Sequence, residues 1–537
     1  MDKIKLIETV TKGSHTRKTV DPELIIGDDA IKNYVEGDIL DANATEQLVK
    51  NKIDNIVDGA VEALDTLKEL GDAIPTKISD LENDAHYVTK EEFEDQLKDY
   101  SVSWYGIMWT SENTVPIRVG NLELHRSLPI QNKMRRCMLE DDGTVHGYID
   151  PTDYTKYENG QAVDYTDATY QYMVEIPEYG FESYSYVENG VTTSLLKLYP
   201  NSDNGSKSKK IYVSAVEATT NDSDSNATTK KLFSTCQAIC TPTDGSIAAS
   251  DVTYASNAAK FRGGDGNSSN DDNLKSRLGK PKTSLTRSAF RTKASARGTG
   301  WSQQYWSGYS AVVRLYVVEY CNFNSQDTYY STTDSNGFKR GGLGDGVSTV
   351  NDTAWNDFNG RNPFVPCGVT KTLVNTTGTI NYVFAANEFT TSSVTVSVPS
   401  YRGIENPFGH INKWTDGINI NTANGTTTVY TTEDISKFAD DTSTNYTQRC
   451  SFTKPENGYI KTWNWDSKGD FIPTSTGGSS SSYLYDYSYW NDGWRVLSSS
   501  GRANNGTDCG WFHFCASSGS AYSNAYIGGR LYYTPAE

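Results

Sequence analysis

The chain ends in YSYWNDGWRVLSSSGRANNGTDCGWFHFCASSGSAYSNAYIGGRLYYTPAE, which runs from Tyr487 to Glu537. Tyr, Trp, Ser, Asn and Gly dominate this stretch, and Lys, Glu, Leu and Val are scarce. A buried core would repeat aliphatic residues with a period of about 2 or 3.6, and a disordered tail would lack aromatics. Antibody paratopes use the same residue types, because Tyr and Trp give rigid contact area while Ser, Asn and Gly adapt their hydrogen bonds. The stretch therefore predicts a binding surface.

Length, charge and composition bound the class of protein. A chain of 537 residues predicts two to four domains of the usual size. The formal net charge of -18 argues against electrostatic binding to phosphate backbones, so nucleic acid is not an expected partner. An aromatic content of 12%, with 35 Tyr, favours a β-rich protein that acts at surfaces over a metabolic enzyme.

The cysteines and the chain's first residues exclude other classes. None of the eight Cys forms a CxxC unit, so a zinc site is not expected and disulfides stay open. The start, MDKIKLIETVTKG, lacks the apolar core of a secretory signal, and no apolar run reaches membrane-spanning length. We expect no cofactor. The Gly-rich segments GGDGN and GGLGDG are interpreted as turns, with a calcium loop as the alternative.

A heptad pattern follows the first fifty residues. Apolar residues recur at alternating steps of three and four, at Ile53, Ile56, Ala60, Ala63, Leu67, Leu70 and Ile74. The spacing predicts a trimeric coiled coil, the alternative being one helix lying on a globular core. Gly59 weakens the helix and Pro75 ends it, so the coil is short.

A connector follows the coil. Thr89 and Glu92 form a capping box that predicts a helix over 89–100. The residues ISDLENDAHYVT at 78–89 and VDGAVEALDTLKEL at 57–70 resemble connector and coiled-coil segments of bacteriophage tail fibres. This resemblance covers about residues 50–100.

The remaining sequence changes character twice. Short apolar runs broken by Asp, Gly and Pro predict hairpins over 104–183, and 201–231 is predicted to be a polar loop region. From residue 261 onward, AVVRLYVVEYCNFNSQ, ENPFGHINKWTDG and IGGRLYY resemble, in order and spacing, the C-type-lectin-like domain of formylglycine-generating enzymes and phage variable receptor-binding proteins. The likeness is greatest to predicted tail proteins of phages that infect gut Bacteroidales.

These observations predict a multidomain α+β, β-rich chain with an N-terminal trimeric coiled coil, a β-rich middle and a C-terminal C-type-lectin-like head. The expected domains are a virion-attachment segment at 1–45, coiled coil and connector at 46–103, a β-rich domain at 104–200, the polar loop region at 201–231 and the head at 232–537.

The resemblance implies where a receptor binds. In the lectin-like fold the last strands and their loops form the exposed end of the domain. The expected receptor-binding residues are therefore Tyr485, Tyr487, Tyr489, Trp490, Arg502, Asn504, Trp511, His513, Tyr522, Asn524 and Tyr526. The alternative is that about half of them are ordinary sheet residues. Core positions are expected at Trp494, Val496, Leu497, Ile527 and Leu531.

Two enzyme hypotheses compete with binding. Cys509 and Cys515 resemble the copper-binding pair of formylglycine-generating enzymes, but five residues separate them where the family has four, so a disulfide or two thiols is preferred. A polysaccharide depolymerase needs two opposed carboxylates. The chain offers many carboxylates, such as Asp265, Asp271, Asp272, Asp345 and Asp416, which makes any chosen pair uninformative. His410 is expected to be a packed histidine.

The predicted function is adhesion by a homotrimeric phage tail-fibre protein, made in the host cytoplasm and carried on the virion. We expect no catalysis. A host surface glycan is the preferred receptor, because planar aromatic side chains suit sugar rings, and an outer-membrane protein is the second choice. Other virion tail proteins are expected to hold the N-terminus.

Overall fold

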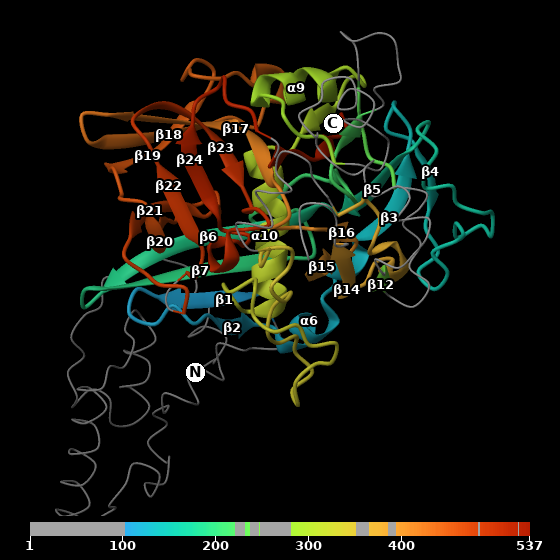
Figure 1. Ribbon diagram of the computed structural model, residues 1–537. Helices are drawn as coiled ribbons and strands as arrows, with labels where there is room; N and C mark the ends of the chain where they lie inside the picture. Colours follow the sequence, from blue (N-terminus) through green and yellow to red (C-terminus); the bar gives the residue numbers. More distant parts are fainter. Residues whose placement is uncertain are drawn as a thin grey trace, which may run out of the picture.

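The computed structural model describes residues 102–220, 231–236, 246–247, 281–350, 365–384 and 394–536, apart from 482, 483 and 525. The predicted attachment segment and all seven heptad positions fall within residues 1–101, which lie outside the described ranges. In the described part, the prediction of a β-rich fold is confirmed, with strands arranged in several sheets (Figure 1).

An antiparallel five-stranded sheet takes all its strands from residues 105–208. Its strands are, in order, β2 (Ile117–Gly120), β1 (Tyr105–Thr110), β7 (Val191–Tyr199), β6 (Tyr179–Glu188) and β8 (Ser206–Ser208). The β6–β7 hairpin turns at Asn189 and Gly190, both with positive φ. An Asn-Gly pair suits this turn because its twist matches that of the flanking strands.

A six-stranded antiparallel sheet joins the two ends of the described chain. Its order is β13 (Trp301–Gln303), β26 (Leu531–Tyr533), β9 (Ile211–Ser214), β5 (Gln171–Ile176), β3 (Arg135–Leu139) and β4 (Val145–Tyr148). The last strand of the predicted head thus pairs with β9, at Tyr532↔Val213 and Tyr533↔Tyr212. The prediction of a polar loop over 201–231 is wrong for β9, whose four residues are all buried.

The largest sheet has nine strands and carries the C-terminal stretch. Along its path lie β19 (Thr447–Thr453), β18 (Thr426–Thr431), β17 (Asn412–Ala423), β23 (Gly493–Ser499), β24 (Phe514–Ser518), β22 (Tyr487–Trp490), β20 (Gly458–Asn464) and β21 (Ile472–Thr476). A ninth strand, β25 (Ile527–Gly528), pairs in parallel with β17.

Two small sheets and the helices complete the described elements. A four-stranded sheet contains β12 (Ser246–Ile247), β14 (Gly378–Phe384), β15 (Val394–Tyr401) and β16 (Ile404–Glu405), and β10 (Thr219–Thr220) pairs with β11 (Leu232–Phe233). The α-helices are α6 (Leu122–Ser127), α9 (Arg287–Ser295) and α10 (Trp306–Tyr320), and the 3₁₀ turns are η4 (Gln131–Lys133), η6 (Lys371–Leu373), η7 (Ile435–Lys437) and η8 (Gly506–Asp508). Within the described ranges, no helix combines the length and apolarity needed to cross a membrane.

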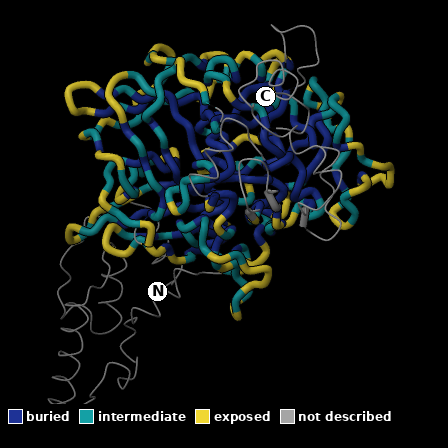
Figure 2. The backbone as a smooth tube through the Cα atoms, in the orientation of Figure 1, coloured by how far each residue is buried: buried dark blue, intermediate teal, exposed yellow. Residues whose placement is uncertain are grey.

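Helix α10 is the centre of the main core. Every residue of WSGYSAVVRLYVVEY except Ser307 is buried, as expected for a helix covered on all sides (Figures 1 and 2). The same hydrophobic cluster includes β1, β5, β6 and β9 together with residues of the C-terminal stretch. The predicted boundaries at 200 and 231 therefore do not separate two cores.

Several residues predicted to be core are confirmed and one is not. Val496, Leu497, Ile527 and Leu531 are buried. Trp494 is half-buried and packs its ring against Tyr430, 5.8 Å away between centroids. Trp494 remains partly exposed because it lies near the start of β23, at the edge of the packed region.

Candidate functional site

A cleft of about 340 Å³ opens where β22, β23, β24 and the loop before β25 meet, and we call it the C-terminal cleft. Five of the eleven predicted receptor-binding residues line it. They are Tyr489, Arg502, His513, Tyr522 and Tyr526, joined by Asn412, Ser498, Asn505, Cys515, Ser517, Ser518, Gly519 and Ile527. The structure therefore brings together a subset of the predicted set.

Strand periodicity decides which residues reach the cleft. Along β24 and the residue before it, His513, Cys515 and Ser517 line the cleft, while the intervening Phe514 and Ala516 are buried. This alternation follows from the two-residue repeat of an extended strand. On the neighbouring β22, Tyr489 pairs with Cys515 and therefore stands on the cleft side.

The same repeat explains why Trp490 is not a receptor contact. It points to the opposite side of β22, where its ring stacks on Phe514 at 5.2 Å between centroids. The expectation that Trp490 belongs to an exposed binding face is therefore wrong.

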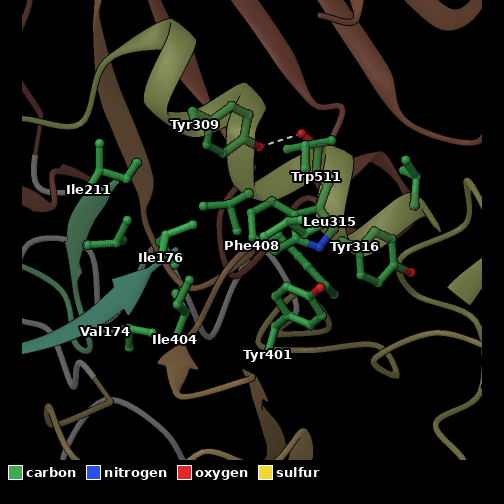
Figure 3. Close-up of a cluster of buried hydrophobic side chains, with 14 of the residues drawn as sticks. Val174, Ile176, Ile211, Tyr309, Leu315, Tyr316, Tyr401, Ile404, Phe408 and Trp511 are labelled. Carbon is green, nitrogen blue, oxygen red and sulfur yellow. Dashed lines mark hydrogen bonds between the residues drawn. The ribbon is translucent and has the colours of Figure 1, made fainter. Parts of the chain in front are cut away.

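Trp511 is also a core residue. It is 3% exposed and packs against Tyr309, Tyr316 and Tyr401, and the Tyr309 hydroxyl donates a hydrogen bond to its backbone carbonyl (Figure 3). The loop before β24 folds inward onto α10, so the expectation of an exposed aromatic anchor at this position is wrong.

A chain of polar contacts forms one wall of the C-terminal cleft. The hydroxyls of Tyr522 and Tyr526 lie 2.5 Å apart, and the Asn524 amide donates to the Tyr522 hydroxyl at 3.1 Å. The Arg502 guanidinium lies 3.9 Å from the Tyr526 ring centroid and donates to the Asn504 side chain at 2.8 Å. This wall thus offers phenol hydroxyls and a cation held over an aromatic face.

Burial controls protonation on this wall. Desolvation, reinforced by the hydrogen bond to Tyr522, raises the pKa of Tyr526 to about 12. The Tyr526 phenol is therefore neutral at physiological pH and can donate a hydrogen bond.

His513 supplies a hydrogen-bond acceptor to the cleft. Its Nδ1 donates to the Asp508 carbonyl at 2.8 Å, which leaves Nε2 as an acceptor. Burial lowers the pKa of His513 to about 4, so the ring is neutral at pH 7. Beside it, Tyr489 donates to Asp508 Oδ2 at 2.9 Å. The cleft therefore presents both donors and an acceptor, as a polyhydroxylated ligand requires.

The remaining predicted residues lie around the cleft. Tyr485, Tyr487, Asn504 and Asn524 are half-buried and are not part of the lining. Tyr487 packs between Tyr459 and Tyr489, with ring centroids 5.1 and 4.6 Å away. Tyr487, Asn504 and Asn524 contact the lining residues Tyr489, Arg502 and Tyr522 respectively.

Sequence reasoning missed Asn412, which lines the C-terminal cleft from β17. Its distance along the chain hides this role, because β17 comes next to the final loop through its parallel pairing with β25, at Asn412↔Ile527. Asn505 and Ser517 were missed although they lie inside the quoted stretch.

The two C-terminal cysteines are free thiols with different partners. The buried Cys509 thiol donates to the Arg502 carbonyl at 3.1 Å, and the half-buried Cys515 thiol lies 3.1 Å from the Ser517 hydroxyl. Desolvation by burial raises the pKa of Cys509, so its reactive thiolate form is disfavoured.

Other candidate side chains have structural partners. Asp416 is fully buried and forms an ion pair with Arg291, with 2.6 Å between Oδ2 and Nε. His410 is packed as predicted, with Nδ1 2.5 Å from Glu217 Oε2 and Nε2 accepting from the Val365 amide at 3.0 Å. Among the described residues, no group of three or more His, Cys, Asp or Glu side chains is arranged to hold a metal ion. Asp265, Asp271 and Asp272 lie outside those residues.

No protein-family model matches the chain, and no curated protein matches it.

Proposed function

We propose that this chain is a phage tail-fibre adhesin and that its C-terminal cleft binds a sugar residue of a host surface glycan. The observation that carries the proposal is the convergence of Tyr489, Arg502, His513, Tyr522 and Tyr526 on one cleft. The resemblance to C-type-lectin-like receptor-binding domains supports the same function.

The chemistry of the cleft suits a saccharide. Tyrosine rings offer flat apolar faces to the C–H side of a sugar ring, and the polar tips remain available for hydrogen bonds. Arg502 and the Tyr522–Tyr526 hydroxyls donate to sugar oxygens, while His513 Nε2 accepts from a sugar hydroxyl. No step of this binding mode requires a metal, a cofactor or catalysis.

Multivalency supplies the affinity of the proposed adhesin. A homotrimer joined through Ile53 to Ile74 would present three clefts on one fibre, and avidity then rises by roughly 10² to 10⁴ over a single site. The segment 1–45 would attach this fibre to other tail proteins of the virion.

Paired tyrosine substitutions test the proposal. Tyr522 and Tyr330 are both 38% exposed, but only Tyr522 lines the C-terminal cleft. We expect Tyr522→Ala to weaken attachment of the purified chain to host cells by about 2 kcal/mol, or roughly thirtyfold, as at a binding hot spot. Tyr330→Ala should attach like the wild type. Equal attachment by both variants, with unchanged melting, would place the receptor site elsewhere.

A further inference from the structure

A second cleft of about 300 Å³, the helix cleft, lies between β8, the first three turns of α10 and the loop before β21. It shares no lining residue with the C-terminal cleft. Phe181, Tyr305 and Trp306 give it apolar walls, and Ser208, Ser310 and Arg314 give it polar ones.

Helix α10 presents its polar residues to this cleft. Ser307, Ser310 and Arg314 follow one another at steps of three and four, so they form a single polar stripe on the helix. The N-cap residue Tyr305 makes no side-chain hydrogen bond to the first turn. The positive end of the helix dipole therefore lies at the cleft without a capping side chain.

Two serine hydroxyls of the helix cleft have no hydrogen-bond partner among the described residues. Ser310 is 2% exposed and Ser208 is 6% exposed, and neither side chain is hydrogen-bonded to any residue in the described part of the chain. Because both side chains line an open cleft, their hydroxyl protons are available to a polar ligand that enters it.

Arg314 carries a charge that no described carboxylate balances. The residue is 4% exposed, its Nε donates to the Tyr179 hydroxyl at 3.2 Å, and Nη1 donates to the Lys468 and Gly469 carbonyls. Its guanidinium lies 3.9 Å from the Phe181 ring centroid. Across the described ranges, no Asp or Glu lies within ion-pair distance of Arg314, although buried charges normally have such a partner.

Several of the other charged groups of the helix cleft are held in ion pairs. Five Lys or Arg residues line it against two acids, Glu433 and Asp470. Lys468 engages Glu433 at 2.8 Å, and Lys207 engages Glu178 at 2.7 Å. Arg449 lies between Asp466 and Asp470, at 2.8 and 2.6 Å. With Lys207, Arg449 and Lys468 held in these ion pairs, Arg314 is the buried cation that an anion in the cleft would meet.

We propose that the helix cleft binds the oxyanion of a sugar-sized ligand, such as a sugar phosphate or a uronic acid. Arg314 would pair with the anion, Ser310 and Ser208 would donate their hydroxyl protons, and Trp306 would contact the apolar face of the ligand. This inference is independent of receptor binding at the C-terminal cleft.

Titration calorimetry on the full chain tests the proposal. The probes are inorganic phosphate, glucose 6-phosphate, glucuronate and neutral glucose. We expect at least one anionic probe to bind at millimolar concentration or below and glucose not to bind, with affinity falling as salt rises. Comparison of glucose 6-phosphate with glucuronate distinguishes a phosphate source from a carboxylate source. No heat with any anion would overturn the proposal.

Variants locate the site. Arg314→Gln and Ser310→Ala should each weaken anion binding by about tenfold or more, because each removes a donor to a charged group. Tyr522→Ala should bind the anion like the wild type, which separates this cleft from the C-terminal one. Should Arg314→Gln not fold, Ser310→Ala and Ser208→Ala decide the outcome, since neither hydroxyl is hydrogen-bonded to a described residue. Wild-type anion affinity in both serine variants would contradict the proposal.

Discussion

Replacement of Trp511 by Ala separates folding from receptor binding in the C-terminal stretch. Trp511 is 3% exposed and packs on Tyr309, Tyr316 and Tyr401. Truncation of a buried aromatic residue costs about 3 to 5 kcal/mol through lost burial and the cavity left behind. The hydrogen bond from Tyr309 survives, because it goes to the backbone carbonyl that Ala also has. We therefore expect a loss of about 3 kcal/mol, near the lower end of that range.

Trp414 provides the matched control for this change. It is fully buried, and its indole Nε1 donates to the Leu285 carbonyl at 2.9 Å, whereas the Trp511 indole nitrogen has no protein acceptor within the described residues. Trp414→Ala should therefore cost about 1 kcal/mol more than Trp511→Ala, which is the usual net value of one hydrogen bond.

Denaturant unfolding measured beside host-cell attachment is the assay. Trp511→Ala should shift the unfolding midpoint and, under conditions where it remains folded, attach like the wild type. An unchanged midpoint with lost attachment would refute the assignment of Trp511 to the core and return it to the receptor site.

Three further outcomes follow from the same structure. Burial lowers the pKa of His513 from 6.5 to about 4, so the unfolded state takes up the proton at a higher pH than the folded state. The free energy of unfolding should therefore fall as pH drops from about 6.5 to about 4. In pH-dependent melts, His513→Gln should reduce that fall. Iodoacetamide labelling followed by mass spectrometry should modify Cys515 before Cys509, because Cys509 is buried and its pKa is raised; equal rates would show that the loop over Cys509 opens readily. Gly510→Ala should lower the free energy of unfolding more than Gly506→Ala, because a Cβ at 510 would lie 2.2 Å from Asp486 Oδ2. A Cβ at 506 would have no atom within 4 Å, so this change costs only about 1 to 2 kcal/mol for the left-handed backbone.

Strand periodicity made part of the site predictable. The alternation in FHFCASS could have assigned His513, Cys515 and Ser517 to one face and Phe514 and Ala516 to the other. Composition alone, by contrast, predicted that Trp490 and Tyr489 both contact the receptor, although they point to opposite sides of β22. Composition identifies a region, and only the two-residue repeat separates its faces.

Other features depend on contacts that sequence patterns do not show. Trp511 lies in a loop, where no repeat indicates direction, and its burial depends on α10 some two hundred residues earlier. Asn412 reaches the cleft through the pairing of β17 with β25. The buried strand β9 lay within a polar range, where averaging over the range hid the short apolar run IYVS.

Glycan binding by the full chain tests the central claim most directly. Wild type, Tyr522→Ala and Tyr330→Ala would be applied to an array of bacterial surface saccharides, with melting measured on each. We predict that the wild type and Tyr330→Ala retain the same saccharides and that Tyr522→Ala loses them by roughly thirtyfold at unchanged melting. Retention of those saccharides by Tyr522→Ala, or binding of no saccharide by the wild type, would contradict a glycan site at the C-terminal cleft.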